Sequence, residues 1–213
     1  LVDIIRQDHP GLPLFLLGHS MGSLLSRTYL VYYSDKVDGV ILTGTAGDPG
    51  LLGSMGLFVS RVQKFFGKRK KSKFMDNLSF GKFNDSFKPN RTGFDWLSRD
   101  EKEVDKYIND EWCGEVFTAG FFVDMMKGVK FINNKTNIEA IRKDLPIAIF
   151  SGENDPVGNF GKGVRLVEKQ YRDSGIQDLT CKLYPDARHE ILNETNRTEV
   201  FSDILDWLQK HTK

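Results

Sequence analysis

Four short segments of the chain, the first of them an uninterrupted apolar run, each have the length of one strand. They are residues 12–19, 37–45, 145–155 and 179–189. A strand that is covered on both faces is almost continuously apolar, whereas a half-exposed strand alternates apolar and polar residues. The pattern therefore predicts four strands of a parallel sheet that has helices on both sides.

The stretches that follow these runs have helical spacing. Between residues 21 and 34, apolar or small side chains recur every three or four positions: Leu24, Leu25, Thr28, Val31 and Tyr32. A second helix is expected over 161–174, with Gly175 as its stop. A last helix is expected after Asn196, a suitable N-cap with Glu199 three residues later. Strands that alternate with helices favour an α/β fold.

A long insertion interrupts this alternation. Residues 48–140 are rich in glycine and charge, and they contain twelve of the 16 phenylalanines. A segment of this length is rarely a bare loop, and a helix is expected over 97–110 with Ser98 as its N-cap. We therefore expect an α/β core formed by 1–47 and 141–213, with a mainly helical cap over 48–140.

Composition narrows the function classes. A net charge of +1 over 213 residues gives no support for nucleic acid as a partner. Two cysteines, Cys113 and Cys181, do not form a disulfide framework, which favours a reducing compartment such as the cytoplasm. No apolar run reaches the roughly 18 to 20 residues that a helix needs to cross a bilayer.

The first strand leads into the stretch LLGHSMGSLL, in which Gly18 and Gly22 flank Ser20 symmetrically. A nucleophilic hydroxyl must project from its own backbone toward a base and toward oxyanion donors. A tight turn from strand to helix achieves this, and glycines two residues away on each side would relieve the crowding. We therefore expect Ser20 to be a nucleophile, with the backbone N–H of Met21 as an oxyanion donor.

The acid is expected at the end of the third strand. Asp155 lies in FSGENDPVG, just before Pro156, which cannot continue a strand. Open parallel sheets bind ligands at this carboxyl edge. An Asp-Pro pair alone is more typical of a turn, but its position between Ser20 and a later histidine favours a catalytic role. Asp144 lies at the wrong end of the strand, and Glu153 remains a nearby alternative.

The base is expected at His189, in YPDARHEIL after the fourth strand. His9 precedes the first strand, His211 is in the terminal segment, and His19 should point away from the Ser20 hydroxyl. No two histidines have the spacing of metal ligands, so neither a metal nor another cofactor is expected. The chain order Ser, Asp, His is the order that α/β-hydrolases use.

Three segments, GHSMGSLL, GENDPVG and YPDARHEILNE, resemble the monoacylglycerol lipase and lysophospholipase branch of the α/β-hydrolases. The resemblance spans essentially the whole chain and includes a cap between the second and third strands. It implies Ser20 as nucleophile, His189 as base, Asp155 as the acid that orients it, and a lipid ester as substrate.

The chain departs from that family at its front. Members have several strands before the nucleophile turn and a His-Gly type loop that supplies a second oxyanion donor, and neither is visible here. The resemblance thus implies an α/β-hydrolase fold without its N-terminal strands and an apolar edge at the first strand. We expect the 213-residue piece alone to have low activity.

The cap suggests how a lipid could reach the site. Residues 51–74 join an apolar stretch to seven basic residues without an acid. The segment 61–73 could contact an anionic membrane surface, although such a run is as often a solvated face. The phenylalanines favour an apolar acyl pocket.

Two other functions stay open at this point. Related capped hydrolases cleave N-terminal residues from peptides and need acidic cap groups, for which Glu111, Glu115 and Asp124 are candidates. A lipid-binding relic without catalysis is the second alternative.

Overall fold

Four parallel strands form the centre of the molecule in a computed structural model, which describes residues 1–48, 50 and 67–212. The strands are β1 (Phe15–His19), β2 (Gly39–Thr43), β3 (Ile147–Gly152) and β4 (Leu179–Tyr184), and they pair in the order β1-β2-β3-β4. All three pairings are parallel. The sheet confirms the predicted α/β fold class, and each strand lies within its predicted run.

Neighbouring residues of the central strands enter different cores, because successive side chains point to opposite faces of a sheet. One core contains Val40, Leu42, Ile147 and Ile149 and packs against Leu30, Val164, Val167 and Tyr171. The other contains Ile41, Ala148, Phe150 and Tyr184 and packs against Ile191, Val200 and Trp207. The two cores explain why the central strands β2 and β3, which are buried throughout, are almost continuously apolar. β1 is an edge strand of the described sheet, and Leu17 in it is 45% exposed.

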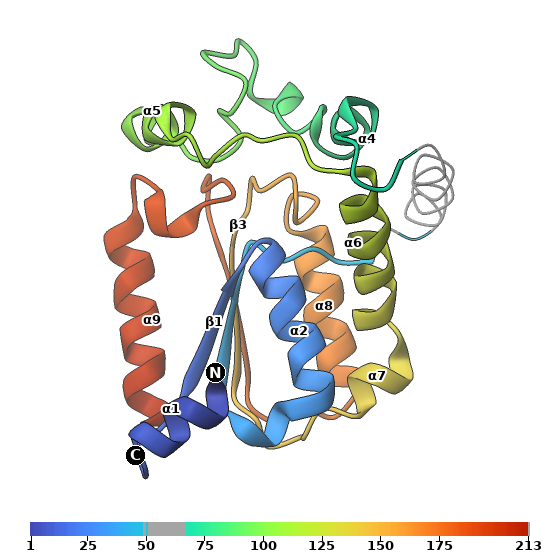
Figure 1. Cartoon of the computed structure of the whole chain (residues 1–213). Helices are drawn as coiled ribbons and strands as arrows, with labels where there is room; N and C mark the ends of the chain where they lie inside the picture. The colour runs from blue at the N-terminus through green and yellow to red at the C-terminus, as the bar shows by residue number, and fades with distance from the viewer. Residues whose placement is uncertain (49, 51–66, 213) are drawn as a thin grey trace.

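Helices cover both faces of the sheet (Figure 1). α9 (Arg197–His211) lies on one side, and α2 (Met21–Tyr33) and α8 (Lys162–Asp173) lie on the other. α1 (Val2–Asp8) and the short helix η1 (Ser34–Lys36) lie near the amino ends of the strands. The predicted helices are thus present, and Gly175, with φ of 90°, follows the end of α8 as expected.

The buried face of α2 is not the apolar one. Its buried residues are Ser23, Ser26, Arg27 and Leu30, whereas Leu25 and Tyr32 are each 61% exposed. The small serines let the helix approach the sheet closely, and their hydroxyls donate to carbonyls of the preceding turn, Ser20 and Gly22. Periodicity predicted the helix correctly, but its apolar residues do not mark the face that packs.

The segment between β2 and β3 carries α4 (Lys73–Phe80), η2 (Asp85–Phe87), α5 (Glu101–Asn109), α6 (Ala119–Ile132) and α7 (Lys135–Glu139). Figure 1 shows α4 and α5 above the carboxyl edge of the sheet and α6 descending beside α2 and α8. Ile138 of α7 already belongs to the core. The exact limits of the cap, 48 and 140, stay a prediction, and most of the predicted lid segment 51–74 lies outside the described residues.

The N-cap predicted for α5 is wrong. The helix begins after Asp100, whose carboxylate accepts from the backbone N–H of Lys102. The hydroxyl of Ser98 instead accepts from the backbone N–H of Asp100 and donates to the carbonyl of Asn193. Ser98 is therefore used to join the cap to the segment after His189.

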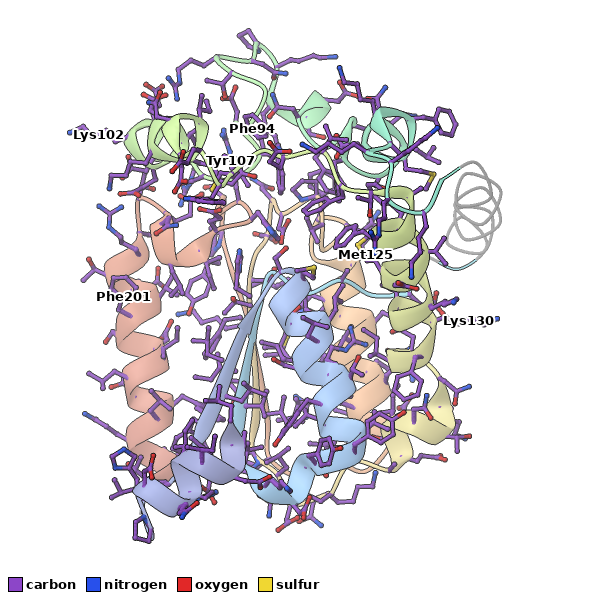
Figure 2. The ribbon with its side chains drawn as sticks, viewed as in Figure 1. Phe94, Lys102, Tyr107, Met125, Lys130 and Phe201 are labelled. Atoms are coloured by element: carbon purple, nitrogen blue, oxygen red, sulfur yellow. The ribbon has the colours of Figure 1, made fainter. Side chains whose placement is uncertain are left out.

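Side chains of the cap separate into an inner and an outer set (Figure 2). Phe94 and Tyr107 lie together, with ring centroids 5.1 Å apart, whereas Lys102 and Lys130 lie at the periphery. Phe201, on the outer side of α9, is half-exposed. Aromatic packing thus holds the layer above the sheet together.

Candidate active site

Three predicted side chains meet at the carboxyl edge of the sheet. Ser20 follows β1, Asp155 lies in the loop after β3, and His189 lies in the loop after β4. His189 Nε2 is 2.9 Å from Ser20 Oγ, and His189 Nδ1 is 2.9 Å from Asp155 Oδ2. The structure therefore brings together a hydroxyl, an imidazole and a carboxylate in one hydrogen-bonded chain.

Ser20 stands on a strained turn between β1 and α2. Its φ of 52° and ψ of −119° are rare for a residue with a side chain. A Cβ added at Gly18 would lie 2.3 Å from Ser26 Oγ and 2.5 Å from the carbonyl oxygen of Gly22. Gly18 is therefore required for the close approach of strand and helix.

The expectation for Gly22 is wrong. A Cβ added there would meet no described heavy atom within 4 Å. It is the backbone carbonyl of Gly22 that approaches Gly18, so the missing side chain of Gly22 is not what relieves the crowding. The two glycines, placed symmetrically about Ser20 in the sequence, therefore have different surroundings in the structure.

Met21 is the first residue of α2. Backbone N–H groups in the first turn of a helix have no acceptor within that helix, and the helix dipole adds positive potential there. The position of the Met21 N–H beside Ser20 is thus compatible with an oxyanion donor.

Asp155 is fully buried and is held by its own loop. Its Oδ1 accepts from the backbone N–H of Val157 at 2.8 Å, which leaves Oδ2 for His189. Asp144 pairs with Arg142 before β3, and Glu153 is exposed. The two alternative carboxylates are therefore not the partners of His189.

His189 is 3% exposed and lies between two other rings. Its centroid is 4.8 Å from that of His19 and 5.1 Å from that of Trp96. Burial, and then the neighbouring His189, lower the pKa of His19 to about 4; its Nδ1 is 3.0 Å from the hydroxyl of Thr43. His19 is therefore a neutral packing partner of His189.

Sequence reasoning discounted His19 and missed its contact with His189. It also missed Gly44, which has φ of 56° and where a Cβ would lie 2.8 Å from His189 Cε1. The glycine directly after the second strand was the available signal. His211 lies elsewhere, with Nε2 3.0 Å from Asp178, and His9 is exposed after α1.

Aromatic rings continue from His189 into the cap. Trp96 is 5.1 Å from Phe83, and Phe83 is 5.7 Å from Phe80, measured between ring centroids. Phe80 in turn neighbours Phe117 and Phe122. The side of the site that faces the cap is thus apolar and aromatic.

The acidic residues that could bind a peptide amine do not belong to this aromatic side of the site. Glu115 pairs with Lys71 and Asp124 lies 3.9 Å from Lys127, and Glu111 is exposed. Each carboxylate is therefore in an environment typical of the protein surface.

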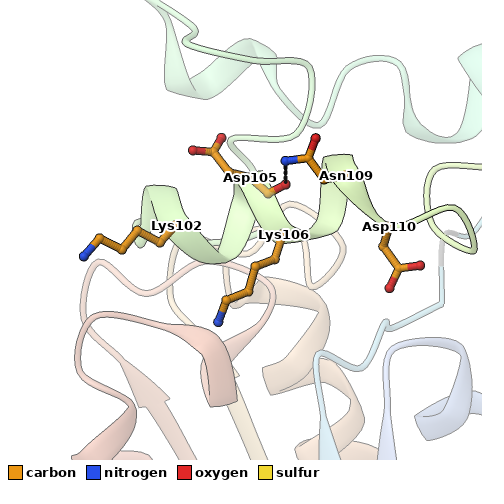
Figure 3. Close-up of a pocket in the computed structure, with 5 residues that line it drawn as sticks. All are labelled: Lys102, Asp105, Lys106, Asn109 and Asp110. Atoms are coloured by element: carbon orange, nitrogen blue, oxygen red, sulfur yellow. Dashed lines mark hydrogen bonds between the residues drawn. The ribbon is translucent and has the colours of Figure 1, made fainter.

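A shallow hollow of about 570 Å³ lies on α5, away from the three meeting side chains. Figure 3 shows that it is lined by polar side chains of that helix and the residue after it: Lys102, Asp105, Lys106, Asn109 and Asp110. The Asn109 side chain donates to the backbone carbonyl of Asp105. An open hollow lined by charged and amide side chains differs from the enclosed, mainly hydrophobic pocket that an acyl chain favours.

Within the described part of the chain, no three His, Cys, Asp or Glu side chains are grouped so that they could hold a metal ion. No helix among these residues is long and apolar enough to cross a bilayer.

A parallel sheet whose strand ends carry serine, acid and histidine in that order defines an α/β-hydrolase. The chain belongs to the Hydrolase_4 family, described as serine aminopeptidase, S33, whose model matches residues 1–196. The family is thus consistent with the fold and with the meeting of Ser20, Asp155 and His189.

Known relatives refine the branch. The chain is 27% identical to a monoglyceride lipase of Mus musculus over 208 residues. The aligned region covers 96% of this chain but only 59% of that relative's length. It is similar to a thermostable carboxyl esterase from Bacillus coagulans solved with glycerol, at 27% identity and a TM-score of 0.91, covering 99% of this chain and 69% of the other.

A monoglyceride lipase from Saccharomyces cerevisiae, solved with a substrate analog, shares the fold. Its TM-score is 0.73 at 23% identity, with 100% of this chain and 66% of the other covered. The chain is thus similar in sequence to a monoglyceride lipase and to a carboxyl esterase, and it shares their α/β-hydrolase fold.

Proposed function

We propose that the protein hydrolyses a carboxylic ester of a lipid, a monoacylglycerol or a lysophospholipid, through an acyl-enzyme on Ser20. The observation that carries the proposal is the chain of two 2.9 Å contacts from Ser20 through His189 to Asp155. Buried Asp155 would hold the imidazole so that Nε2 faces the hydroxyl, and would stabilise the imidazolium that forms.

The reaction would proceed in two halves. His189 Nε2 takes the proton of Ser20 as Oγ attacks the ester carbonyl, and the Met21 N–H stabilises the oxyanion. The tetrahedral intermediate collapses, His189 returns the proton to the departing alcohol, and Ser20 carries the acyl group. A water molecule, deprotonated by His189, then releases the fatty acid and restores the serine hydroxyl.

The aromatic side chains between His189 and the cap support a lipid rather than a peptide as substrate. Trp96 and Phe83 lie next to His189 and offer the apolar, aromatic lining that acyl chains favour. A peptide substrate would need a carboxylate to hold its free amine, yet Glu115 already pairs with Lys71.

A capped aminopeptidase is the second candidate, because the matching family is described by that activity. A panel of glyceryl esters, lysophospholipids and aminoacyl amides separates the two functions. We expect low but measurable turnover of the lipid esters alone, and loss of that turnover with an unchanged fold in Ser20→Ala and His189→Ala. Preferential cleavage of the amides, or no cleavage of any ester, would contradict the proposal.

We further propose that the basic cap segment 61–73 contacts an anionic lipid surface. Of its described part, Lys68, Arg69 and Lys70 are exposed, and Phe74 and Leu78 on the helix that follows, α4, are each 57% exposed. Exposed basic residues followed along the chain by exposed apolar ones suit a membrane interface. Co-sedimentation with liposomes should rise with anionic lipid content and fall when residues 68–71 are neutralised. Binding that depends neither on anionic lipid content nor on the charges of residues 68–71 would refute the contact.

A further inference from the structure

Glu194 is a carboxylate that is completely buried outside the chain of catalytic contacts. It follows η3 (Ile191–Asn193), five residues after His189. Its Oε1 accepts from the backbone N–H groups of Arg188 and Arg99, at 2.9 and 3.0 Å. Its Oε2 accepts from Arg99 Nε and the backbone N–H of Thr195, both at 2.9 Å. Each oxygen is therefore used by donors from different segments.

These donors come from three parts of the fold. Arg99 belongs to the cap segment before α5, Arg188 immediately precedes His189, and Thr195 leads into α9. Arg188, in the histidine loop, also binds the cap segment, since its guanidinium donates to the carbonyls of Asp95 and Ser98. The cap segment 95–99 and the loop 188–194 are thus fastened to each other through buried polar contacts.

The fastened cap segment touches the histidine itself. The backbone N–H of His189 donates to the carbonyl of Trp96 at 3.3 Å, and that of Glu190 donates to the carbonyl of Leu97 at 2.8 Å. The Trp96 ring lies 5.1 Å from the imidazole. The loop that carries the imidazole is therefore bounded on one side by the cap segment.

We infer that Glu194 is a positioning residue for the hydrolysis, which fixes cap segment 95–99 against the histidine loop and thereby sets the imidazole in line with Ser20. This inference rests on the proposed function. The geometry suits a carboxylate, because all four N–H groups point at its two oxygens, whereas an amide would turn a donor toward two of them. A displacement of about 1 Å at the reacting groups can cost about a hundredfold in rate.

Glu194→Gln tests the inference, with Glu199→Gln as the matched control. Glu199 is an exposed carboxylate on α9 that pairs with Lys182 and accepts from the side chain of Asn196, without a direct hydrogen bond to cap segment 95–99 among the described contacts. We expect Glu194→Gln to lower kcat and the rate of Ser20 labelling by a fluorophosphonate about tenfold to a hundredfold, with KM changed less than about twofold. Hydrogen exchange at the amides of His189 and Glu190 should accelerate. Glu199→Gln should match the wild type in each measurement.

Rates are compared where circular dichroism shows each variant to be folded. If Glu194→Gln does not fold, Arg99→Met removes the guanidinium but keeps the backbone donors, and it should show the same changes on a smaller scale. A folded variant that labels and turns over like the wild type would overturn the inference. Failure of the wild type itself to label would instead overturn the proposed function, so the two failures are distinguishable.

Discussion

Ser20 adopts a backbone conformation that few residues other than glycine tolerate, with φ of 52°. Such strain persists where the surroundings enforce it. Here the backbone N–H of Ser20 donates to the carbonyl of Thr43 at 2.9 Å, and Gly18 lets α2 lie close against β1. The hydroxyl is thus held toward His189 before any substrate arrives.

The two glycines of the motif should respond differently to alanine. In Gly18→Ala the new methyl group would collide with the Gly22 carbonyl, so we expect a loss of at least about 2 kcal/mol in the free energy of unfolding. Gly22→Ala fills open space in a helix and should change stability by less than about 1 kcal/mol, in the stabilising direction. Urea unfolding measures both, and equal losses would contradict the asymmetry.

His19 should make the fold sensitive to acid. Its pKa is about 4 in the folded protein against an ordinary 6.5, because it is buried and faces His189. The unfolded chain therefore binds more protons between these values, and stability falls as the pH drops through that window. At pH 5 the expected loss from this group is about 2 kcal/mol relative to pH 8.

Urea unfolding of the wild type and of His19→Gln at pH 8 and pH 5 measures this contribution. The variant should lose less stability on acidification than the wild type. Equal losses would show that His19 is not the responsible group.

At the scale of elements, α2 is joined to the far end of α6 by a buried arginine. Arg27 is 1% exposed and donates to the carbonyl of Ala46 at 2.7 Å and to the side-chain oxygen of Asn133 at 3.0 Å. Its guanidinium also lies 6.0 Å from the centre of the Tyr171 ring. The helix that begins at Ser20 is therefore tied both to the loop after β2 and to the segment that returns from the cap.

Arg27→Met should lower the free energy of unfolding by about 1–3 kcal/mol, because two partly buried oxygens lose their donor. Arg165→Met is the control, since Arg165 is half-exposed on α8 and pairs with Glu168 at the surface; its effect should stay within about 0.5 kcal/mol. Thermal or urea unfolding measures both variants, and a smaller loss of stability in Arg27→Met than in Arg165→Met would contradict this role.

The sequence predicted the strands and most helices because buried parallel strands and capped helices have local signatures. It could not predict which face of α2 is buried, since Ser23 and Ser26 satisfy their hydroxyls within the helix and so pack as small residues. Nor could it predict that Ser98 joins the cap to Asn193, because that contact spans 95 positions.

Over the whole molecule, the sheet gathers groups that are far apart in the chain. Ser20 and His189 are separated by 169 positions and lie 2.9 Å apart because parallel strands end at one edge. The order of chemistry-bearing residues along the chain was enough to anticipate this meeting. The contacts from cap segment 95–99 to the histidine loop were not, because no motif in the sequence marks Trp96 or Arg99 as partners of that loop.

Covalent labelling measures most directly whether the three side chains act together. The protein is treated with a fluorophosphonate, and intact mass and peptide mapping follow the modification over time. We expect one equivalent on Ser20, and a rate reduced by at least about 10³ in His189→Ala and strongly reduced in Asp155→Asn. Modification at another residue, or labelling of Ser20 in His189→Ala as fast as in the wild type, would contradict the account.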